Sequence, residues 1–458
     1  MQFFIPLPHM RGGEEESTAR CAEQGTKVKR FDPDSPRAIV VAAPASGSGK
    51  TLITLGLLRA FRNRGLRVAS AKVGPDYIDP RFHEAATGRA CYNLDPWAMS
   101  PALIGSLTSD LAAGSDLVII EGVMGLFDGP RGAKGSTADL AALLSLPVIL
   151  TLDCRHQAQS AAALVHGFAS FRPGLPLAGV ILNRVASDRH EALLREAIGA
   201  PVIAALRNEA VLSLPSRHLG LVQAQENQDL ETFIEAAAAR VSETALLDRL
   251  LDLAAPLSHA PGKSALPPLG QSIAVARDEA FSFAYPHLLD GWRKQGAGLS
   301  FFSPLADEAP DPGADGVFLP GGYPELHAGR LAGNHRFLSG LRNHAGLIYG
   351  ECGGYMVLGE SLCDSNGMAH AMAGLLPVST SFATRKLHLG YRRLTPLPGS
   401  PWPGRLAAHE FHYSTLTSEG DAARLFEAED AAGVPLPPMG LRRGKVMGSY
   451  AHVIAEAQ

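Results

Sequence analysis

The chain has 458 residues, which is too long for one ordinary hydrophobic core and fits two or three domains. Hydrophobic residues make up 46% of the sequence and charged residues 19%, the balance of a soluble globular enzyme. The formal net charge of −4 gives no reason to expect nucleic acid or a membrane surface as a partner. No apolar run reaches the roughly 20 residues that a membrane span needs.

The cysteines and the first residues bear on the compartment. Five cysteines occur without a CxxC pair or an even framework, which favours reduced thiols and a cytoplasmic protein. The start, MQFFIPLPHM, has no basic segment ahead of its apolar residues, so a signal peptide is not expected. Residues 1–36 are poor in core-forming side chains and are predicted to be a mobile extension.

The pattern of residues 37–254 predicts a first α/β domain. Residues 38–43 form a continuous apolar run, as a buried parallel strand requires, and a helix is predicted from Thr51 to about Arg64. Ala/Leu-rich helical segments separate further predicted strands at residues 67–72, 117–120, 147–152 and 178–182. Strands that alternate with helices predict a mostly parallel, doubly wound sheet.

A proline-rich stretch, residues 255–270, is predicted to be a linker to a second, smaller α/β domain at residues 271–458. In that domain we expect a helix near residues 281–294 and strands at 273–276, 299–302, 316–319 and 346–349.

The segment AAPASGSGKT, residues 42–51, lies between a predicted strand and a helix, which is the setting of a phosphate-binding P-loop. Its glycines let successive backbone N–H groups face the phosphates, the lysine can reach the β/γ-phosphates, and the threonine can ligate Mg²⁺. One departure is Ala43, where the pattern usually has its first glycine. The predicted ATP-binding residues of the loop are Gly47, Ser48, Gly49, Lys50 and Thr51.

Acidic residues gather around this loop. Glu121 ends the strand DLVII and is predicted to ligate Mg²⁺ together with Thr51, and the family resemblance described below implies that Asp76 is a further ligand. Asp76 and Asp79 flank Tyr77 in KVGPDYIDP, residues 72–80, and Asp128 follows in EGVMGLFDG, residues 121–129. Acids beside a triphosphate indicate a metal, although loop acids are otherwise solvated turn formers.

Asn183 ends the strand in LAGVILNRV, residues 177–185. An asparagine in this place can contact a nucleotide base, or it can simply form a turn, and the sequence leaves both interpretations open.

The second domain carries a nucleophile elbow. In YGECGGYMVLG, residues 349–359, Cys352 follows an apolar run and has glycines two residues before and after it. Such a turn exposes the thiol, and the N-terminus of the following helix is expected to lower its pKa. Upstream, FLPGGYPELH places Gly321 and Gly322 after another strand, where their N–H groups can form an oxyanion hole.

The predicted general base is His452, near the end of the chain, with His409 or His412 of HEFHYS as alternatives. An acid two residues after the histidine would complete a triad, but position 454 is isoleucine. The sequence therefore predicts a cysteine–histidine dyad.

Together these segments resemble the corrin a,c-diamide synthases, over about residues 38–452. Further segments that carry the resemblance are NLDPWAM, residues 93–99, and ARDEAFSFAYP, residues 276–286. The resemblance implies a dethiobiotin-synthetase-like P-loop domain joined to a class I glutamine amidotransferase domain. It also implies that Asp79, Asp128 and Tyr77 line the synthetase site. The closing segment AHVIAEAQ departs from the family, which usually has a second histidine and a phenylalanine there.

The implied reaction uses ATP, Mg²⁺ and L-glutamine to amidate the a and c acetate side chains of a corrinoid in cobalamin biosynthesis. The carboxylate is phosphorylated first, and ammonia from glutamine then displaces the phosphate. Cobalt-containing cobyrinate and metal-free hydrogenobyrinate are both candidate substrates, with hydrogenobyrinate favoured. A homodimer is also compatible with the sequence.

Three other classes fit less well. A dethiobiotin-synthetase-like ligase would lack the ECGG elbow, and a MinD-like nucleotide switch would carry a second lysine early in the loop, where Ser46 and Gly47 stand. A cobyric acid synthase, which amidates other side chains of the ring, is the nearest alternative, and KVGPDYIDP and NLDPWAM argue against it.

Overall fold

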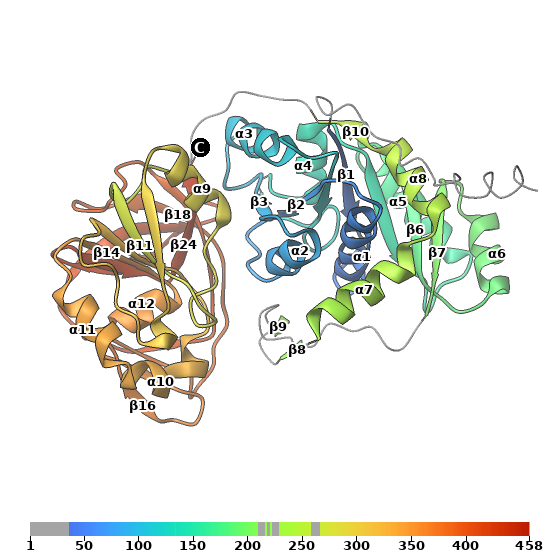
Figure 1. The fold of residues 1–458 in the computed structure, drawn as a ribbon. Helices are drawn as coiled ribbons and strands as arrows, with labels where there is room; N and C mark the ends of the chain where they lie inside the picture. Colours follow the sequence, from blue (N-terminus) through green and yellow to red (C-terminus); the bar gives the residue numbers. More distant parts are fainter. Residues whose placement is uncertain are drawn as a thin grey trace, which may run out of the picture.

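The computed structural model of the protein consists of two α/β halves that lie side by side (Figure 1). It describes residues 36–132, 134–208, 229–257 and 266–457, and the backbone of two short strands, β8 (Ser216–Arg217) and β9 (Gly220–Leu221). The predicted N-terminal extension lies outside the described residues, apart from Pro36. No helix of the described part is long and apolar enough to cross a membrane.

The N-terminal half is built on an eight-stranded sheet of order β3-β2-β4-β1-β5-β6-β7, with β10 paired to the start of β1. All pairings are parallel except that of β10, as the alternation of strands and helices predicts. The strands are β1 (Arg37–Ala42), β2 (Val68–Val73), β3 (Tyr92–Leu94), β4 (Leu117–Glu121), β5 (Val148–Asp153), β6 (Leu177–Val185), β7 (Val202–Arg207) and β10 (Ala255–Pro256).

Helices cover both faces of this sheet, because alternate residues of its buried strands point to opposite sides. Val40 packs into the core under α3 and α4, whereas Ile39 and Val41 pack against α1, α7 and α8. The helices are α1 (Lys50–Asn63), α2 (Asp79–Thr87), α3 (Pro101–Ala112), α4 (Thr137–Leu144), α5 (Ser160–Ser170), α6 (Asp188–Ala197), α7 (Leu230–Val241) and α8 (Thr244–Leu253).

The C-terminal half contains a ten-stranded mixed sheet of order β12-β11-β13-β14-β23-β22-β21-β18-β19-β24. The first five strands are parallel and the others join antiparallel. Their bounds are β11 (Ser272–Ala276), β12 (Gly298–Phe302), β13 (Gly316–Leu319), β14 (Leu347–Glu351), β18 (His388–Pro396), β19 (Leu406–His412), β21 (Ala423–Asp430), β22 (Pro435–Arg443), β23 (Val446–Ser449) and β24 (Ala451–Glu456).

A four-stranded sheet and short helices complete this half. The strands are β15 (Ser361–Cys363), β16 (Ala369–Ala371), β17 (Val378–Ser381) and β20 (Thr415–Glu419). The helices are α9 (Pro286–Lys294), α10 (Ala328–Gly333), α11 (His335–Asn343) and α12 (Gly353–Leu358), with 3₁₀ turns at Pro304–Ala306 and Pro324–His327.

The proposed linker at residues 255–270 begins inside the first half. Ala255 and Pro256 form β10, whose partners are Ala38 and Arg37, and Leu257 N–H donates to the carbonyl of Pro36 at 2.9 Å. Proline tolerates this place because β10 is a short edge strand. The ordered start of the segment thus adds a strand to the first sheet, which its proline content did not predict.

Contacts between the halves include hydrogen bonds made by β3 and by the loop that follows it. The Tyr391 hydroxyl donates to Asp95 at 2.8 Å, and the Tyr92 hydroxyl donates to Asp290 at 2.9 Å. Asp95 also accepts N–H groups from the turn that follows it, and burial raises its pKa to about 6. The NLDPWAM segment therefore anchors one half to the other.

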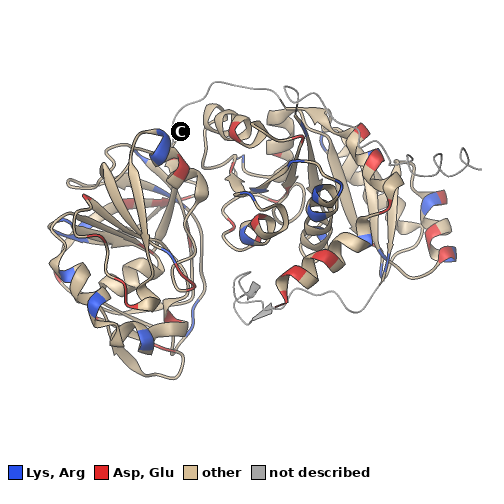
Figure 2. Cartoon of the chain, viewed as in Figure 1, with Lys and Arg blue, Asp and Glu red and all other residues tan. Residues whose placement is uncertain are grey.

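Helices α1 and α7 cross closely, and a charged group clamps the crossing. Figure 2 shows acidic positions on α7 beside basic positions on α1. The buried Arg59 pairs with Glu231 at 2.7 Å and Glu235 at 2.6 Å, and it donates to the carbonyls of Ala85 and Ala86 in α2 at 3.0 Å. One arginine thus joins three helices.

We predict that Gly56→Ala, at this crossing, destabilises the protein. The added Cβ would collide with the carbonyl oxygen of Ala237 in α7, and such overpacking costs about 1–3 kcal/mol. Gly167→Ala is the matched control, because its Cβ meets nothing within 4 Å, and it should stabilise α5 by about 0.5–1 kcal/mol. Urea unfolding followed by circular dichroism measures both; equal midpoints for the two variants would contradict the prediction.

Candidate active sites

The P-loop follows β1 and leads into α1, as predicted. Gly47 and Gly49 have φ of 80° and 90°, which only glycine adopts readily. A Cβ on Gly49 would also collide with the side-chain amide of Asn183, whose Nδ2 donates to the Ser48 carbonyl at 2.9 Å. Asn183 therefore holds the loop from the end of β6, and the role in contacting a base stays a prediction.

Lys72, at the end of β2, lies among the predicted acids. Its Nζ pairs with Asp79, lies 2.8 Å from Glu121 Oε1 and lies 3.8 Å from Asp76 Oδ2. The Thr51 hydroxyl donates to the same Glu121 oxygen at 2.7 Å. Lys50 Nζ is 4.0 Å from this oxygen. The structure therefore brings Lys50, Thr51, Asp76, Asp79 and Glu121 together.

These groups change each other's ionisation. Burial alone would raise the pKa of Glu121, but Lys72 and His83 hold it well below its usual range. Burial and the charge of Asp76 raise the pKa of Asp79 to about 6, an effect that Lys72 only partly offsets. Burial and Lys72 also lower the pKa of Lys50. A ligand that brings positive charge would favour the ionised form of Asp79.

Lys72 and His83 are site residues that our sequence analysis missed. His83 in α2 is fully buried, with Nε2 2.6 Å from Glu121 Oε2 and Nδ1 3.5 Å from the thiol of Cys91. Burial would lower its pKa, but Cys91 and Glu121 raise it to about 10. The signal for Lys72 was its place as the first residue of KVGPDYIDP, directly at a strand end.

Asp128 is placed differently from the other acids. Its Oδ2 accepts the Gly125 N–H at 2.8 Å and closes the turn after β4, next to the backbone of Pro44 in the P-loop. Its side chain is exposed. Within this structure Asp128 shapes a turn beside the loop, and direct contact with a substrate stays a prediction.

In the second half, Cys352 occupies the sharp turn between β14 and α12. Its φ of 47° is a strained conformation for a residue with a side chain. The elbow needs its glycines, because a Cβ on Gly354 would collide with the Leu319 carbonyl, and one on Gly350 would lie 2.8 Å from Leu358 Cδ1. Cys352 N–H donates to the carbonyl of Ser449 at 2.8 Å, which fixes the turn against β23.

His452 lies beside this cysteine. A Cβ on Gly321 would lie 3.0 Å from His452 Nε2 and 3.2 Å from Cys352 Cβ, so both side chains meet around Gly321. The N atom of Gly322 lies within 3.1 Å of a Cβ built on Gly353. The predicted nucleophile, base and oxyanion glycines are thus neighbours in space, although their roles stay predictions.

The ionisation of Cys352 differs from our expectation. Burial and the charge of Glu325 raise the pKa of its thiol, so the helix N-terminus does not hold it low in this structure. Burial, together with His409 and His412, lowers the pKa of His452 to about 3. In both groups burial thus favours the neutral form.

The predicted cysteine–histidine dyad stays a prediction, and the structure adds an acid near the histidine that the sequence analysis did not name. Glu351, the residue before the cysteine, places Oε2 3.9 Å from His452 Nδ1, and both side chains are buried. Its other oxygen accepts the Val453 N–H at 3.0 Å. The sequence pattern pointed to position 454 for an acid, whereas Glu351 lies on β14.

Tyr77 connects the two sites. Its ring centroid lies 4.3 Å from that of His452 and 5.3 Å from that of Phe283. Its hydroxyl lies 3.4 Å from Nδ1 of His409. An adjoining cavity of about 430 Å³ between the halves has a mostly apolar lining: Pro75, Asp76, Tyr77, Ile78, Val123, Met124, Gly129, Pro130, Gly135, Phe283, Leu389, Gly390, Tyr391, His409 and Phe411.

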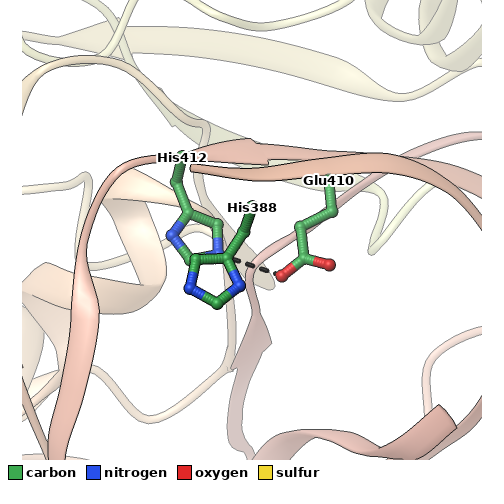
Figure 3. Close-up of side chains that lie close together, drawn as sticks. All are labelled: His388, Glu410 and His412. Atoms are coloured by element: carbon green, nitrogen blue, oxygen red, sulfur yellow. Dashed lines mark hydrogen bonds and ion pairs between the residues drawn. The ribbon is translucent and has the colours of Figure 1, made fainter. Parts of the chain in front are cut away.

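His388, Glu410 and His412 form a second polar cluster, with one ligand atom each within 4.8 Å of the others (Figure 3). Glu410 Oε1 lies 2.9 Å from His412 Nε2, and its Oε2 lies 2.7 Å from Arg392. His412 Nδ1 is 3.1 Å from the Ser414 carbonyl. Since the charges of Glu410 and both nitrogens of His412 already have partners, the cluster braces the end of β19 next to Cys352.

The two halves match separate family models. Residues 39–222 match the CobQ/CobB/MinD/ParA nucleotide binding domain, and residues 272–458 match the CobB/CobQ-like glutamine amidotransferase domain. Fold and sites thus define a glutamine-dependent amide ligase with its own nucleotide-binding half.

Curated relatives define the family more closely. A hydrogenobyrinate a,c-diamide synthase of Brucella anthropi is 56% identical over 428 residues, which cover 91% of this chain and 98% of that protein. Enzymes of the same name are 55% identical in Rhizobium meliloti, with the same coverage, and 54% identical in Rhodobacter capsulatus, with 92% and 99% covered. The chain belongs to the hydrogenobyrinate a,c-diamide synthase family.

We predict that Lys72→Met destabilises the N-terminal half. Removing the cation leaves buried Asp79 without its closest counter-charge and leaves Glu121 with His83 as its nearest cation, which costs about 3–5 kcal/mol. Lys445→Met, which removes an exposed lysine bound only to a carbonyl, should change stability by less than about 0.5 kcal/mol.

The double variant Lys72→Met/Asp79→Asn separates charge from packing. If charge is the cause, neutralising Asp79 returns part of the lost stability, as measured by thermal and urea unfolding. A double variant that is less stable than Lys72→Met would show that packing of the lysine stem dominates.

Proposed function

We propose that the protein amidates the a and c acetate carboxylates of hydrogenobyrinate, using ATP and glutamine, as a step of cobalamin biosynthesis in the cytoplasm. The observation that carries this proposal is the mostly apolar cavity between a P-loop half and a glutaminase half. The substrate is supported by the relatives, which are hydrogenobyrinate a,c-diamide synthases. The homodimer stays a prediction.

The nucleotide site offers oxygen donors that fit Mg²⁺. Thr51, Asp76 and Glu121 supply a hydroxyl and two carboxylates within one small volume, and Mg²⁺ prefers oxygen ligands. When bound with ATP, the ion would neutralise charge on the phosphates. Lys50 would contact the β/γ-phosphates, and Lys72 keeps the acids compensated. Transfer of the γ-phosphoryl group to a substrate carboxylate yields an acyl phosphate and ADP.

The cavity between the halves suits a large ring with peripheral carboxylates. Its walls are mainly apolar, with exposed Met124 and Leu389 at the opening and aromatic rings of Tyr77, Tyr391 and Phe283 inside. Asp76 joins this wall to the metal ligands, so a carboxylate at the wall would lie near the transferred phosphoryl group.

In the other half, Cys352 Sγ would attack the side-chain amide carbon of glutamine. His452 takes the thiol proton and passes it to the departing nitrogen, which leaves as ammonia. N–H groups near Gly321 and Gly322 would stabilise the oxyanion. Water then hydrolyses the thioester, which releases glutamate and the thiol.

Ammonia has a short way to the acyl phosphate. Phe283 and Phe411 line both the cavity at Cys352 and the cavity between the halves. Ammonia attacks the acyl carbon, phosphate leaves with the bonding electrons, and a proton lost from nitrogen completes the amide. A path enclosed by aromatic rings keeps ammonia unprotonated and away from solvent.

We predict opposite phenotypes for the two sites. Cys352→Ala should abolish amidation with glutamine but leave amidation with ammonium salts unchanged, because only the nitrogen supply is lost. Lys50→Ala should abolish amidation with either donor. Coupled ADP release measures both, and equal loss with both donors in a folded Cys352→Ala variant would contradict the two-site model.

The substrate itself can be tested by mass spectrometry. Incubation with ATP, Mg²⁺ and glutamine should add two amides to hydrogenobyrinate and fewer to cobyrinate at the same concentration. Amides at other side chains, located by fragmentation, would instead support cobyric acid synthase activity. No amide on either corrinoid would refute the proposed function.

A further inference from the structure

We propose that Glu351 is the positioning residue of the glutaminase: its carboxylate binds Nδ1–H of His452 and turns Nε2 toward Cys352. This inference rests on the proposed role of Cys352 and His452. In a triad, an acid two positions after the histidine would orient the imidazole. Position 454 is isoleucine in this chain, so we assign that role to Glu351, the residue before the nucleophile.

The geometry separates the two ring nitrogens of His452. Nε2 lies on the side of Gly321 and Cys352, whereas Nδ1 lies 3.9 Å from Glu351 Oε2. Within the described residues neither nitrogen has a hydrogen-bond partner. The Nδ1 contact needs to shorten by about 1 Å to become a hydrogen bond, and such contacts commonly tighten when substrate binds.

The carboxyl group of Glu351 has two further neighbours, the backbone N–H of Val453 and the hydroxyl group of Tyr349. The Val453 N–H donates to Oε1 at 3.0 Å, which ties the carboxyl group to the strand that carries His452. Oε2 is the oxygen nearer the imidazole. The side chain is 2% exposed, so water does not compete for it at the surface.

Burial favours an ion pair between Glu351 and His452 over either charge alone. It raises the pKa of Glu351 to about 8, and together with His409 and His412 it lowers the pKa of His452 to about 3. When His452 takes the thiol proton, its positive charge favours the ionised form of Glu351, and the two opposite charges then stabilise each other. Tyr77, Phe283, His409 and His412, which also act on His452, carry no negative charge. Glu410 does carry one that favours protonated His452, but it is already paired with Arg392 and His412.

The test compares Glu351→Gln with Glu351→Asp. The amide of Glu351→Gln still accepts the Val453 N–H, so this variant removes the charge and keeps the structural contact. We expect a roughly 10- to 1,000-fold lower kcat for glutamine hydrolysis, by analogy with loss of the acid from a catalytic triad. The KM for glutamine and the ammonia-dependent amidation should stay unchanged. Glu351→Asp, which keeps the charge, should retain more activity than Glu351→Gln.

Two controls separate the possible failures. Wild-type kcat in Glu351→Gln overturns the positioning role, while glutamine-dependent amidation by Cys352→Ala would instead overturn the proposed nucleophile. Loss of ammonia-dependent activity would show that Glu351→Gln does not fold. In that case, glutamine hydrolysis by Glu351→Ala with added formate tests the positioning role instead. Recovery of glutamine hydrolysis by formate, but not by chloride, supports the role, and no recovery overturns it.

Discussion

The short loop between β2 and α2 constrains both halves of the molecule. Asp76 of this loop and Asp79, the first residue of α2, lie beside Lys72 in the nucleotide half, while Tyr77 between them covers His452 of the other half. Because consecutive residues serve two sites, neither site can shift without moving the other. The buried contacts of Tyr77 with Phe283 and Tyr285 keep the loop pressed against the second half.

This constraint explains why so many charges are buried at one edge of the first sheet. Carboxylates that must meet a metal and phosphates cannot be replaced by apolar residues, so they need compensation when no ligand is present. Lys72 and His83 supply it from β2 and α2, each in contact with Glu121. The opposite charges of the cluster then largely cancel, which allows it to be buried. The neighbouring charges also cause the pKa shifts of its members.

Much of this arrangement follows from the sequence. Short sequence patterns predict the P-loop, the elbow and the parallel strands. Glycine spacing and apolar runs reflect what the backbone requires over a few residues. His83 and Glu351 gave no such signal, because their partners Glu121 and Val453 lie 38 and 102 residues away. Lys72 stands at a strand end, but its contact with Glu121 spans 49 residues. The expected low pKa of Cys352 was wrong for a related reason: burial by distant segments outweighs the local helix end.

The surroundings of position 454 explain why this position does not carry an acid. His452 and Ile454 lie two residues apart on β24, and Ile454 is buried with its carbonyl accepting from His287 at 2.9 Å. A carboxylate there would enter an apolar environment with no cation, whereas Glu351 reaches the imidazole from β14 and meets a backbone N–H. The strand that presents the nucleophile can therefore also present the acid. In that arrangement the imidazole of His452 is contacted by two consecutive residues. Glu351 lies near Nδ1, and the turn at Cys352 brings the thiol to the side of Nε2.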